Sequence, residues 1–593
     1  MRWNLLSFLI WEYLLFSCAM PIEVFKVSSE WRRDSPSRSE ESISEKADLS
    51  KTFPFYSSFS LLRGDVVLYW NLNDDETISF KIRAEITGNM KSEGFLGFGF
   101  SPRGKEDRDV VMVTWTEDRP IEIADAFTNE EGILLPDERC DYHMESSNIL
   151  YEDGDIFLEV ELTRYFNTKD PEDYQIEWGT TWTFFMLDHQ MPEFYRKLNL
   201  ETMDVVERPL SLLKSNQYQY EPNLPPDTKL REFTVNKFQI PVDDTTYWCQ
   251  TFRFDLQEKV HGIKYESLIT PGNEMIVHHM ELYHCEVPPD TKIPDYSGPC
   301  PEKPKQLNVC SKVIAAWAMG AEPLVYPIEA GVPLGGSTWS KHLMLEVHYN
   351  NPRKLPGLID NSGIRYYYTK TLRRFDIGVL EVGVTYSPNL VIPPQEEDFE
   401  WNGLCLPSCT SGLPSEGIQV FASQLHAHLS GREIKTKHFR GDVELPLLDK
   451  DPHYTTFFQD IRLLPDNVLI LPGDTLVTTC RFNTEDRVNV TLGGYGILDE
   501  MCVNYLHYYP KTDLEVCKST VSQDALNFFF EETTVSFRGS NSQHDIQRKS
   551  TVELFSTVDW SDMTKSLWRE IANVGPMVEE CLASNGKAFQ HDN

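Results

Sequence analysis

The sequence predicts an all-β protein built from several sandwich domains, and three observations support this. Runs rich in β-branched and aromatic residues are short, and Gly, Asp and Asn turn signals bound them. Sustained helical periodicity is scarce, with one helix expected at Met563–Val574. A chain of 593 residues also exceeds what one core supports, so roughly three or four domains are expected.

The first residues have the features of an export signal. An apolar run extends from Leu5 to Phe16, and Ser17 and Ala19 are small residues that suit cleavage after Ala19. The run contains Glu12 and is short for a membrane-spanning helix, although an uncleaved signal anchor is the alternative. No later segment has about 18 consecutive apolar residues. The mature chain is therefore expected in the lumen of the secretory pathway or outside the cell.

The elements that follow are mostly strands. Residues 20–52 carry few aliphatic side chains and predict a flexible leader. Pro222, Pro225 and Pro226 mark a linker between residues 216 and 229, and short strands continue from about 235 to 510. Three β-like runs before the linker predict an antiparallel sandwich: Val66–Trp70, Gly94–Phe100 and Asp109–Trp115.

The net charge argues against one class of partner. Lys and Arg number 55, whereas Asp and Glu number 91, which gives a net charge of -36. A field of this sign repels phosphate backbones and anionic membrane surfaces, so a nucleic-acid partner is not expected.

Three groups of histidines lie in strand-like surroundings. His426 and His428 are two residues apart, so on a strand they share one face and could share a metal ion; a solvated face is the alternative. His278 and His279 are adjacent and point apart on a regular strand, so both could bind one ion only if the backbone is irregular there. His348, taken alone, is more typical of a hydrogen-bonded core histidine.

The identity of a bound metal depends on a further ligand. Imidazole suits zinc, copper and iron alike. A thioether favours Cu(I), and Met501 is the candidate. Its alternative role is that of an ordinary core methionine.

Several ordered motifs resemble the copper type II ascorbate-dependent monooxygenases. The resemblance extends from about Tyr247 to Cys517. Three segments carry it, namely His278–Cys285 (His-His-Met, two residues, an aromatic, one residue, Cys), Phe421–Gly431 (His-X-His followed by Gly) and Asn483–Pro510. The family usually has Thr between the paired histidines, where this chain has Ala427.

The N-terminal region resembles a DOMON domain, which indicates the dopamine β-hydroxylase branch of the family. Its motifs are Gly97–Pro102, Asp109–Val111 and Ile123–Asp125. The resemblance implies a DOMON β-sandwich followed by two jelly-roll-like β-sandwich copper domains. The expected order is signal peptide 1–19, leader 20–52, DOMON domain 53–175, linker region 176–232, N-terminal copper domain 233–371, C-terminal copper domain 372–520 and C-terminal extension 521–593.

The resemblance also implies two copper sites and a reaction. Dioxygen would hydroxylate a C–H bond of a small, catecholamine-like substrate, with ascorbate as the reductant. Tyr508 matches an aromatic of the family and is a catalytic candidate, with a core role as the alternative. The implied ligands are His278, His279 and His348 for the first copper, and His426, His428 and Met501 for the second.

The cysteines complete the expectations. Cleavage of the signal would remove Cys18, and spacing alone cannot pair the other 11. Cys140 is left unpaired or joins two chains, and the interchain cysteines of dopamine β-hydroxylase have no counterpart near 528–547. Asn489 begins a glycosylation sequon. The resemblance implies the pairs Cys249–Cys300, Cys285–Cys310, Cys405–Cys517, Cys409–Cys581 and Cys480–Cys502.

Two other functions compete with a monooxygenase. A pseudoenzyme of the same family would bind copper without turnover, and the complete ligand set argues against it. A zinc hydrolase is disfavoured because no His-Glu-X-X-His helix is present and Met501 would have no role.

Overall fold

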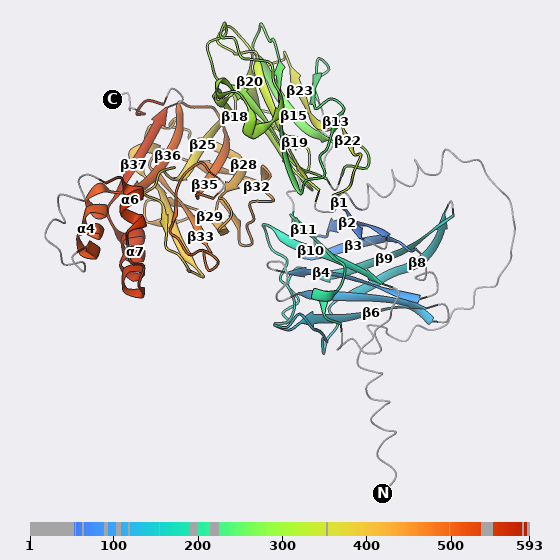
Figure 1. Cartoon of the computed structure of the whole chain (residues 1–593). Helices are drawn as coiled ribbons and strands as arrows, with labels where there is room; N and C mark the ends of the chain where they lie inside the picture. The colour runs from blue at the N-terminus through green and yellow to red at the C-terminus, as the bar shows by residue number, and fades with distance from the viewer. Residues whose placement is uncertain are drawn as a thin grey trace. The chain divides into compact units, whose positions relative to one another are not determined.

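The computed structural model divides the chain into two compact units, Met1–Leu213 and Lys214–Asn593 (Figure 1). The expected signal peptide and leader, Pro102 and most of the expected linker lie outside the described residues. The structure describes residues 53, 55–61, 64–87, 93–101, 108–116, 119–152, 154–188, 198–213, 224–274, 276–351, 354–496, 498–534, 549–583 and 586–589.

The first unit is built from two antiparallel sheets, which confirms the predicted sandwich. One sheet has the order β1 (Phe55–Leu61), β2 (Gly64–Leu72), β3 (Thr77–Glu85), β9 (Asp155–Tyr165), β8 (His143–Glu152). The other has the order β11 (Val205–Leu210), β10 (Thr181–Asp188), β4 (Glu93–Ser101), β5 (Asp109–Thr116), β6 (Arg119–Thr128), β7 (Leu134–Pro136). Because β10 and β11 belong to this sheet, the sandwich extends into residues that the sequence assigns to a linker. A short 3₁₀ turn, η3 (Leu200–Thr202), precedes β11.

Aromatic rings hold the two sheets together. Phe59 of β1 packs against Phe185 of β10 with ring centroids 4.7 Å apart, and Phe80 of β3 packs against Phe98 of β4 at 5.1 Å. All four side chains are fully buried. Alternation along each strand therefore directs one row of side chains into a shared core.

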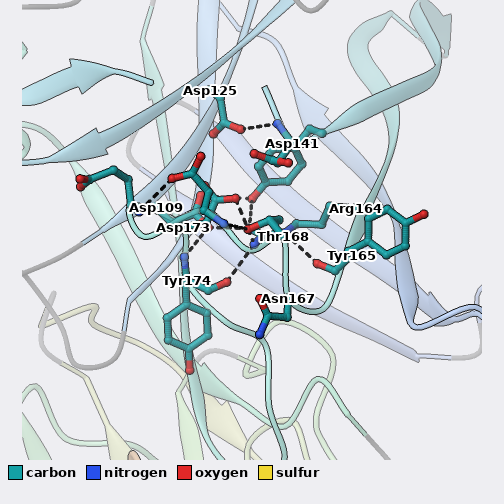
Figure 2. A network of polar contacts seen from close by, with 12 residues as sticks. Asp109, Asp125, Asp141, Arg164, Tyr165, Asn167, Thr168, Asp173 and Tyr174 are labelled. Atoms are coloured by element: carbon teal, nitrogen blue, oxygen red, sulfur yellow. Dashed lines mark hydrogen bonds and ion pairs between the residues drawn. The ribbon is translucent and has the colours of Figure 1, made fainter. Parts of the chain in front are cut away.

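A buried polar network lies in the same unit (Figure 2). The Arg164 guanidinium forms an ion pair with Asp109 and lies 3.7 Å from Asp173. Burial, followed by the charge of Asp109, raises the pKa of Asp125 well above its ordinary value. The same two causes raise the pKa of Asp173 to about 7.

Cys140 also lies in the first unit. It is disulfide-bonded, and the described residues include no free cysteine. The prediction of an unpaired Cys140 is therefore wrong, because the spacing of cysteines along a chain does not reveal which of them meet in the fold.

The first half of the second unit contains two large sheets and a strand pair, β13 (Phe238–Gln239) with β22 (Ile359–Asp360). One sheet has the order β12 (Lys229–Thr234), β23 (Gly363–Thr369), β15 (Val260–Leu268), β20 (Ala330–Leu334), β24 (Phe375–Asp376), with β19 (Leu324–Val325) also paired to β15. The other has the order β17 (Ser297–Pro299), β14 (Thr245–Arg253), β21 (His342–Asn350), β16 (Val277–Cys285), β18 (Cys310–Ala318). Two 3₁₀ turns, η5 (Cys300–Glu302) and η6 (Lys305–Val309), lead into β18.

The second half repeats this plan with two further sheets and the pair β26 (Val391–Ile392) and β34 (Thr491–Leu492). One sheet has the order β32 (Arg462–Ile470), β28 (Ile418–His426), β35 (Val503–Tyr509), β25 (Gly378–Val384), β36 (Leu514–Val521), β37 (Met577–Ala583). The other has the order β27 (Phe399–Cys405), β33 (Asp474–Phe482), β29 (Gly431–Arg440), β30 (Val443–Glu444), with β31 (Asp449–Asp451) also paired to β29.

One hydrophobic core crosses between the two halves of the second unit. Phe421, Leu463 and Tyr509 from the second half belong to the same buried cluster as Tyr326 and Leu345 from the first. The two halves are therefore packed against each other within one unit.

Few helices complete the second unit. The predicted helix at Met563–Val574 is confirmed as α7 (Asp562–Val574). Its neighbours α4 (Gln523–Thr534) and α6 (Thr551–Ser556) were not predicted, and α3 (Pro407–Thr410) is a single turn. Phe529, Phe555 and Trp568 of these helices pack against the core of the second half, so the C-terminal region is part of this fold (Figure 1). Among the described residues, none of these helices has the length and apolar content to cross a membrane.

Candidate metal centres

The first histidine group lies on two neighbouring strands. His279 of β16 is paired directly with His348 of β21. The register of the two strands shifts between Val277 and His279, so His278 is the extra residue of a β-bulge. This irregularity gives the adjacent residues His278 and His279 access to the same point, which a regular strand would prevent.

Three imidazole nitrogens converge at this point. The Nδ1 atom of His279 lies 3.3 Å from Nδ1 of His278 and 3.3 Å from Nδ1 of His348. One candidate ligand atom from each of the three residues lies within 4.8 Å of the others. Metal–imidazole bonds are about 2.0 Å long, so two nitrogens 3.3 Å apart would subtend about 110° at a shared ion. The spacing fits a three-imidazole metal centre.

The surroundings of His279 and His348 favour neutral rings. Burial lowers the pKa of His348 to about 3, with a smaller contribution from His278. Burial also lowers the pKa of His279 well below its ordinary value, and its two histidine neighbours add to the effect. The Tyr247 ring stacks on His348, with centroids 4.3 Å apart and an angle of 2° between the planes. Neutral, oriented imidazoles retain a lone pair for a metal.

The second histidine pair lies where a strand ends. His426 is the last residue of β28 and His428 follows two residues later, with ring centroids 5.2 Å apart. Nδ1 of His428 lies 3.0 Å from the carbonyl oxygen of Asp499, which can only accept a hydrogen bond. His428 therefore carries its proton on Nδ1 and exposes the Nε2 lone pair.

Gln459 fixes His426 in the same way. Its Nε2 donates to the carbonyl oxygen of Thr456 at 2.6 Å, which turns its Oε1 toward Nδ1 of His426. An amide oxygen only accepts, so His426 also carries its proton on Nδ1. Both rings thus offer Nε2 as the metal-binding atom.

Met501 is held beside this pair. Its backbone N–H donates to Oε2 of Glu500 at 3.3 Å, and the N–H of His428 donates to the same oxygen at 2.8 Å. Met501 is 6% exposed and precedes Cys502, which is bonded to Cys480. One carboxylate oxygen therefore links the backbone of Met501 to that of His428.

Tyr508 does not lie with the histidines. It is fully buried in a core cluster with Leu380 and Leu506, and its hydroxyl donates to the carbonyl oxygen of Leu514. The tyrosine beside the second pair is instead Tyr505, whose ring centroid is 6.1 Å from that of His426. The two tyrosines are three positions apart, so they occupy opposite faces of β35.

Two disulfide bridges begin in segments that carry proposed ligands. The bridges whose two cysteines both lie in the described residues are the five pairs that the resemblance implies: Cys249–Cys300, Cys285–Cys310, Cys405–Cys517, Cys409–Cys581 and Cys480–Cys502. Cys285 ends the strand that carries His278 and His279, and Cys502 follows Met501 directly. Disulfide bonds therefore constrain the backbone next to proposed ligands of both centres.

Sequence reasoning missed four residues that orient the ligands: Tyr247, Tyr454, Gln459 and Glu500. Of these, Glu500 offered the clearest signal, because it is an acidic residue directly before a candidate ligand, Met501. Gln459 lies 33 residues from His426, and no local pattern connects the two.

The donor atoms define the class of protein first. Two imidazole centres, one with a thioether beside it, are typical of a transition-metal protein, and this donor set fits copper. Domain families then match most of the chain. The N-terminal domain of copper type II ascorbate-dependent monooxygenases matches residues 231–356, and the C-terminal domain of the same family matches residues 375–530. The DOMON domain matches residues 62–189.

Whole-length relatives agree with these matches. Dopamine beta-hydroxylase of Bos taurus is 38% identical over 92% of this chain and 88% of its own length. Tyramine beta-hydroxylase of Caenorhabditis briggsae is 36% identical over 89% of this chain and 88% of its own length. DBH-like monooxygenase protein 1 of Mus musculus is 36% identical over 77% of this chain and 73% of its own length. The chain belongs to the copper type II ascorbate-dependent monooxygenase family, a family of oxidoreductases.

Proposed function

We propose that this protein hydroxylates a C–H bond of a small aromatic amine, using dioxygen, ascorbate and two copper ions per chain. Similarity to dopamine and tyramine beta-hydroxylases supports an amine of the catecholamine type as the first substrate to test. The observation that carries the proposal is the convergence of three Nδ1 atoms on one point, with separations of 3.3 Å. A second histidine pair beside Met501 provides a chemically different centre.

The two sets of donors suit two different tasks. His278, His279 and His348 would hold one copper, and an all-imidazole set accommodates both oxidation states. The other copper would bind to His426, His428 and Met501, where the thioether favours Cu(I). Copper in these sites would supply electron transfer and dioxygen activation. The chain's own contribution is to hold the imidazole rings in fixed orientations and to keep them partly shielded from water.

A secretory-pathway location agrees with this function. Five disulfides in the second unit are typical of proteins that mature in an oxidising compartment. Asn489 of the sequon is exposed in the loop between β33 and β34, where a glycosylating enzyme could reach it. We retain cleavage after Ala19 as part of the proposal, along with the domain order of a DOMON sandwich followed by two copper domains.

Metal analysis and oxygen uptake test the function together. We expect the purified secreted chain to bind about two copper ions and to consume dioxygen in the presence of ascorbate and phenylethylamines. Mass spectrometry should detect a product that has gained one oxygen atom. Copper binding without product across amines, phenols and peptides would instead indicate a pseudoenzyme, and absence of bound copper would refute both readings.

A further inference from the structure

Glu500 has a carboxylate that is fully buried beside the second centre. Its Oε2 accepts hydrogen bonds from the N–H of His428 at 2.8 Å and from the N–H of Met501 at 3.3 Å. Its Oε1 accepts from the N–H of Ser430 at 2.6 Å and from the Ser430 hydroxyl at 2.7 Å. One side chain therefore binds the backbones of two proposed ligands that are distant in sequence.

The local backbone explains why such a partner is needed. His428 lies beyond the end of β28 and Met501 lies before the start of β35, so neither N–H is within a named strand. Buried N–H groups outside a ladder require another acceptor. The residue before Glu500 also contributes, because the Asp499 carbonyl oxygen accepts from Nδ1 of His428. The 499–501 segment thus fixes both the ring and the backbone of His428.

We propose that Glu500 is a positioning residue, whose carboxylate sets the separation between His428 and Met501 and so determines whether both can bind one copper ion. This inference rests on the proposed function. Glu500 has no contact with the reacting atoms in this scheme; it acts through the two ligands that it holds.

The hydrogen-bond directions predict how a near-isosteric change would act. In all four of these hydrogen bonds the partner of Glu500 is the donor, so both of its oxygens must accept. Glu500→Gln replaces one oxygen with an NH₂ group, which would then face either the N–H of Ser430 or those of His428 and Met501. Because two donors cannot bond to each other, Glu500→Gln must lose its hydrogen bonds either to the N–H of Ser430 or to the N–H groups of His428 and Met501.

A matched control exists in the same half of the unit. Asp474 is a buried carboxylate at the start of β33 that accepts from Nε of Arg440 at 2.9 Å and from the N–H of Leu471 at 2.8 Å. It pairs with Arg440, at the opposite end of β29 from Gly431 and about 30 Å along the strand. Asp474→Asn makes the same chemical change at the end of β29 that lies away from the second centre.

The test uses the full secreted chain, loaded with copper and reduced by ascorbate. X-ray absorption reports whether sulfur scatters from copper, and a competitive chelator titration reports Cu(I) affinity. In Glu500→Gln we expect loss of the sulfur signal and a 10- to 100-fold fall in affinity at the second centre, while the first copper stays bound. Asp474→Asn should lose thermal stability but keep the sulfur signal and both affinities.

Each outcome decides the question. An unchanged sulfur signal and affinity in Glu500→Gln would overturn the inference. If that variant is not secreted, Ser430→Ala takes its place, since it removes one hydrogen bond to Glu500. We expect about a fivefold fall in Cu(I) affinity at the second centre. An unchanged affinity would contradict the positioning role of Glu500. A wild-type chain that lacks the second copper altogether would refute the proposed function instead, so the two failures can be told apart.

Discussion

The two candidate centres are held in place by different kinds of structure. Strand pairing builds the first centre, because His279 and His348 are register partners and a bulge adds His278. Side-chain hydrogen bonds build the second, where Gln459 orients His426, and Glu500 binds the backbones of His428 and Met501. The ladder fixes the first set of donors, whereas the second set lies at strand ends and depends on individual polar groups.

This difference predicts how each centre responds to substitution. A ladder tolerates changes in side chains that surround it, since the backbone bonds remain. A network of single buried hydrogen bonds does not, because each lost partner leaves a polar group without compensation. We therefore expect conservative substitutions to damage the second centre more than the first.

Met501→Ile should have the largest effect on turnover. Isoleucine preserves most of the buried volume but removes the thioether that favours Cu(I). We expect ascorbate-dependent hydroxylation to fall by about 100-fold or more, while the three-histidine centre keeps its copper. Turnover assays combined with metal analysis measure both quantities. The matched control is Met186→Ile, a change at a fully buried methionine of the first unit; equal losses in the two variants would contradict the ligand role of Met501.

Tyr454→Phe should have an intermediate effect. The Tyr454 hydroxyl accepts from the N–H of Ala427 at 2.9 Å and donates to the carbonyl oxygen of the same residue at 2.6 Å, between the two paired histidines. Its loss leaves two buried backbone groups without a partner, which costs about 1–3 kcal/mol of stability. We expect about a tenfold fall in turnover, with the first copper retained.

A second tyrosine separates positioning from general stability. Tyr265 is also buried and donates to the carbonyl oxygen of Ala316 at 3.0 Å, but it lies on β15, outside both centres. Tyr265→Phe should lower the free energy of unfolding without changing copper affinity. If neither Tyr454→Phe nor Tyr265→Phe changed copper affinity, the hydrogen bonds around the second centre would not control copper binding there.

The sequence predicted the ligands of the second centre but not the residues that orient them. His426 and His428 are spaced for one face of a strand, and the resemblance added Met501. Gln459 and Tyr454 come from a separate segment, so only the fold could connect them with the histidines. The sequence showed that His278 and His279 could share an ion only if the backbone were irregular, but it did not show the bulge itself. Register is a long-range property of paired strands, so only the fold reveals it.

Register also explains why Tyr508 was an ambiguous candidate. A spacing of seven residues from Met501 does not show which face of β35 a tyrosine occupies, and the structure places Tyr508 in the core and Tyr505 beside His426. Helix α7 was predictable because its apolar residues follow a helical period, and Ser561 caps it. Helix α6 was missed although Ser550 and Glu553 form a capping box, a signal that the sequence itself carries.

The first unit provides a third arrangement, in which carboxylates rather than imidazoles are buried together. Because burial and Asp109 raise the pKa values of Asp125 and Asp173, the folded unit binds more protons than the unfolded chain from about pH 4 to neutral pH and above. Stability contributed by these groups should therefore fall as pH rises through this range. The smallest effect on activity is expected here, since neither residue belongs to a proposed copper centre.

Asp125→Asn should flatten this pH dependence, because a neutral amide has no proton to lose. Hydrogen exchange of the β5 amides (Asp109–Thr116) in the full chain, compared at pH 5.5, 7 and 8.5 after correction for intrinsic rates, would report the stability of this unit alone. We expect protection to decline with pH in the wild type and to decline less in the variant, with copper content equal in both. Parallel pH profiles would instead show that the buried carboxylates remain ionised and that Arg164 compensates their charge fully. The network would then be held by hydrogen bonds and ion pairs, as the second centre is held by hydrogen bonds.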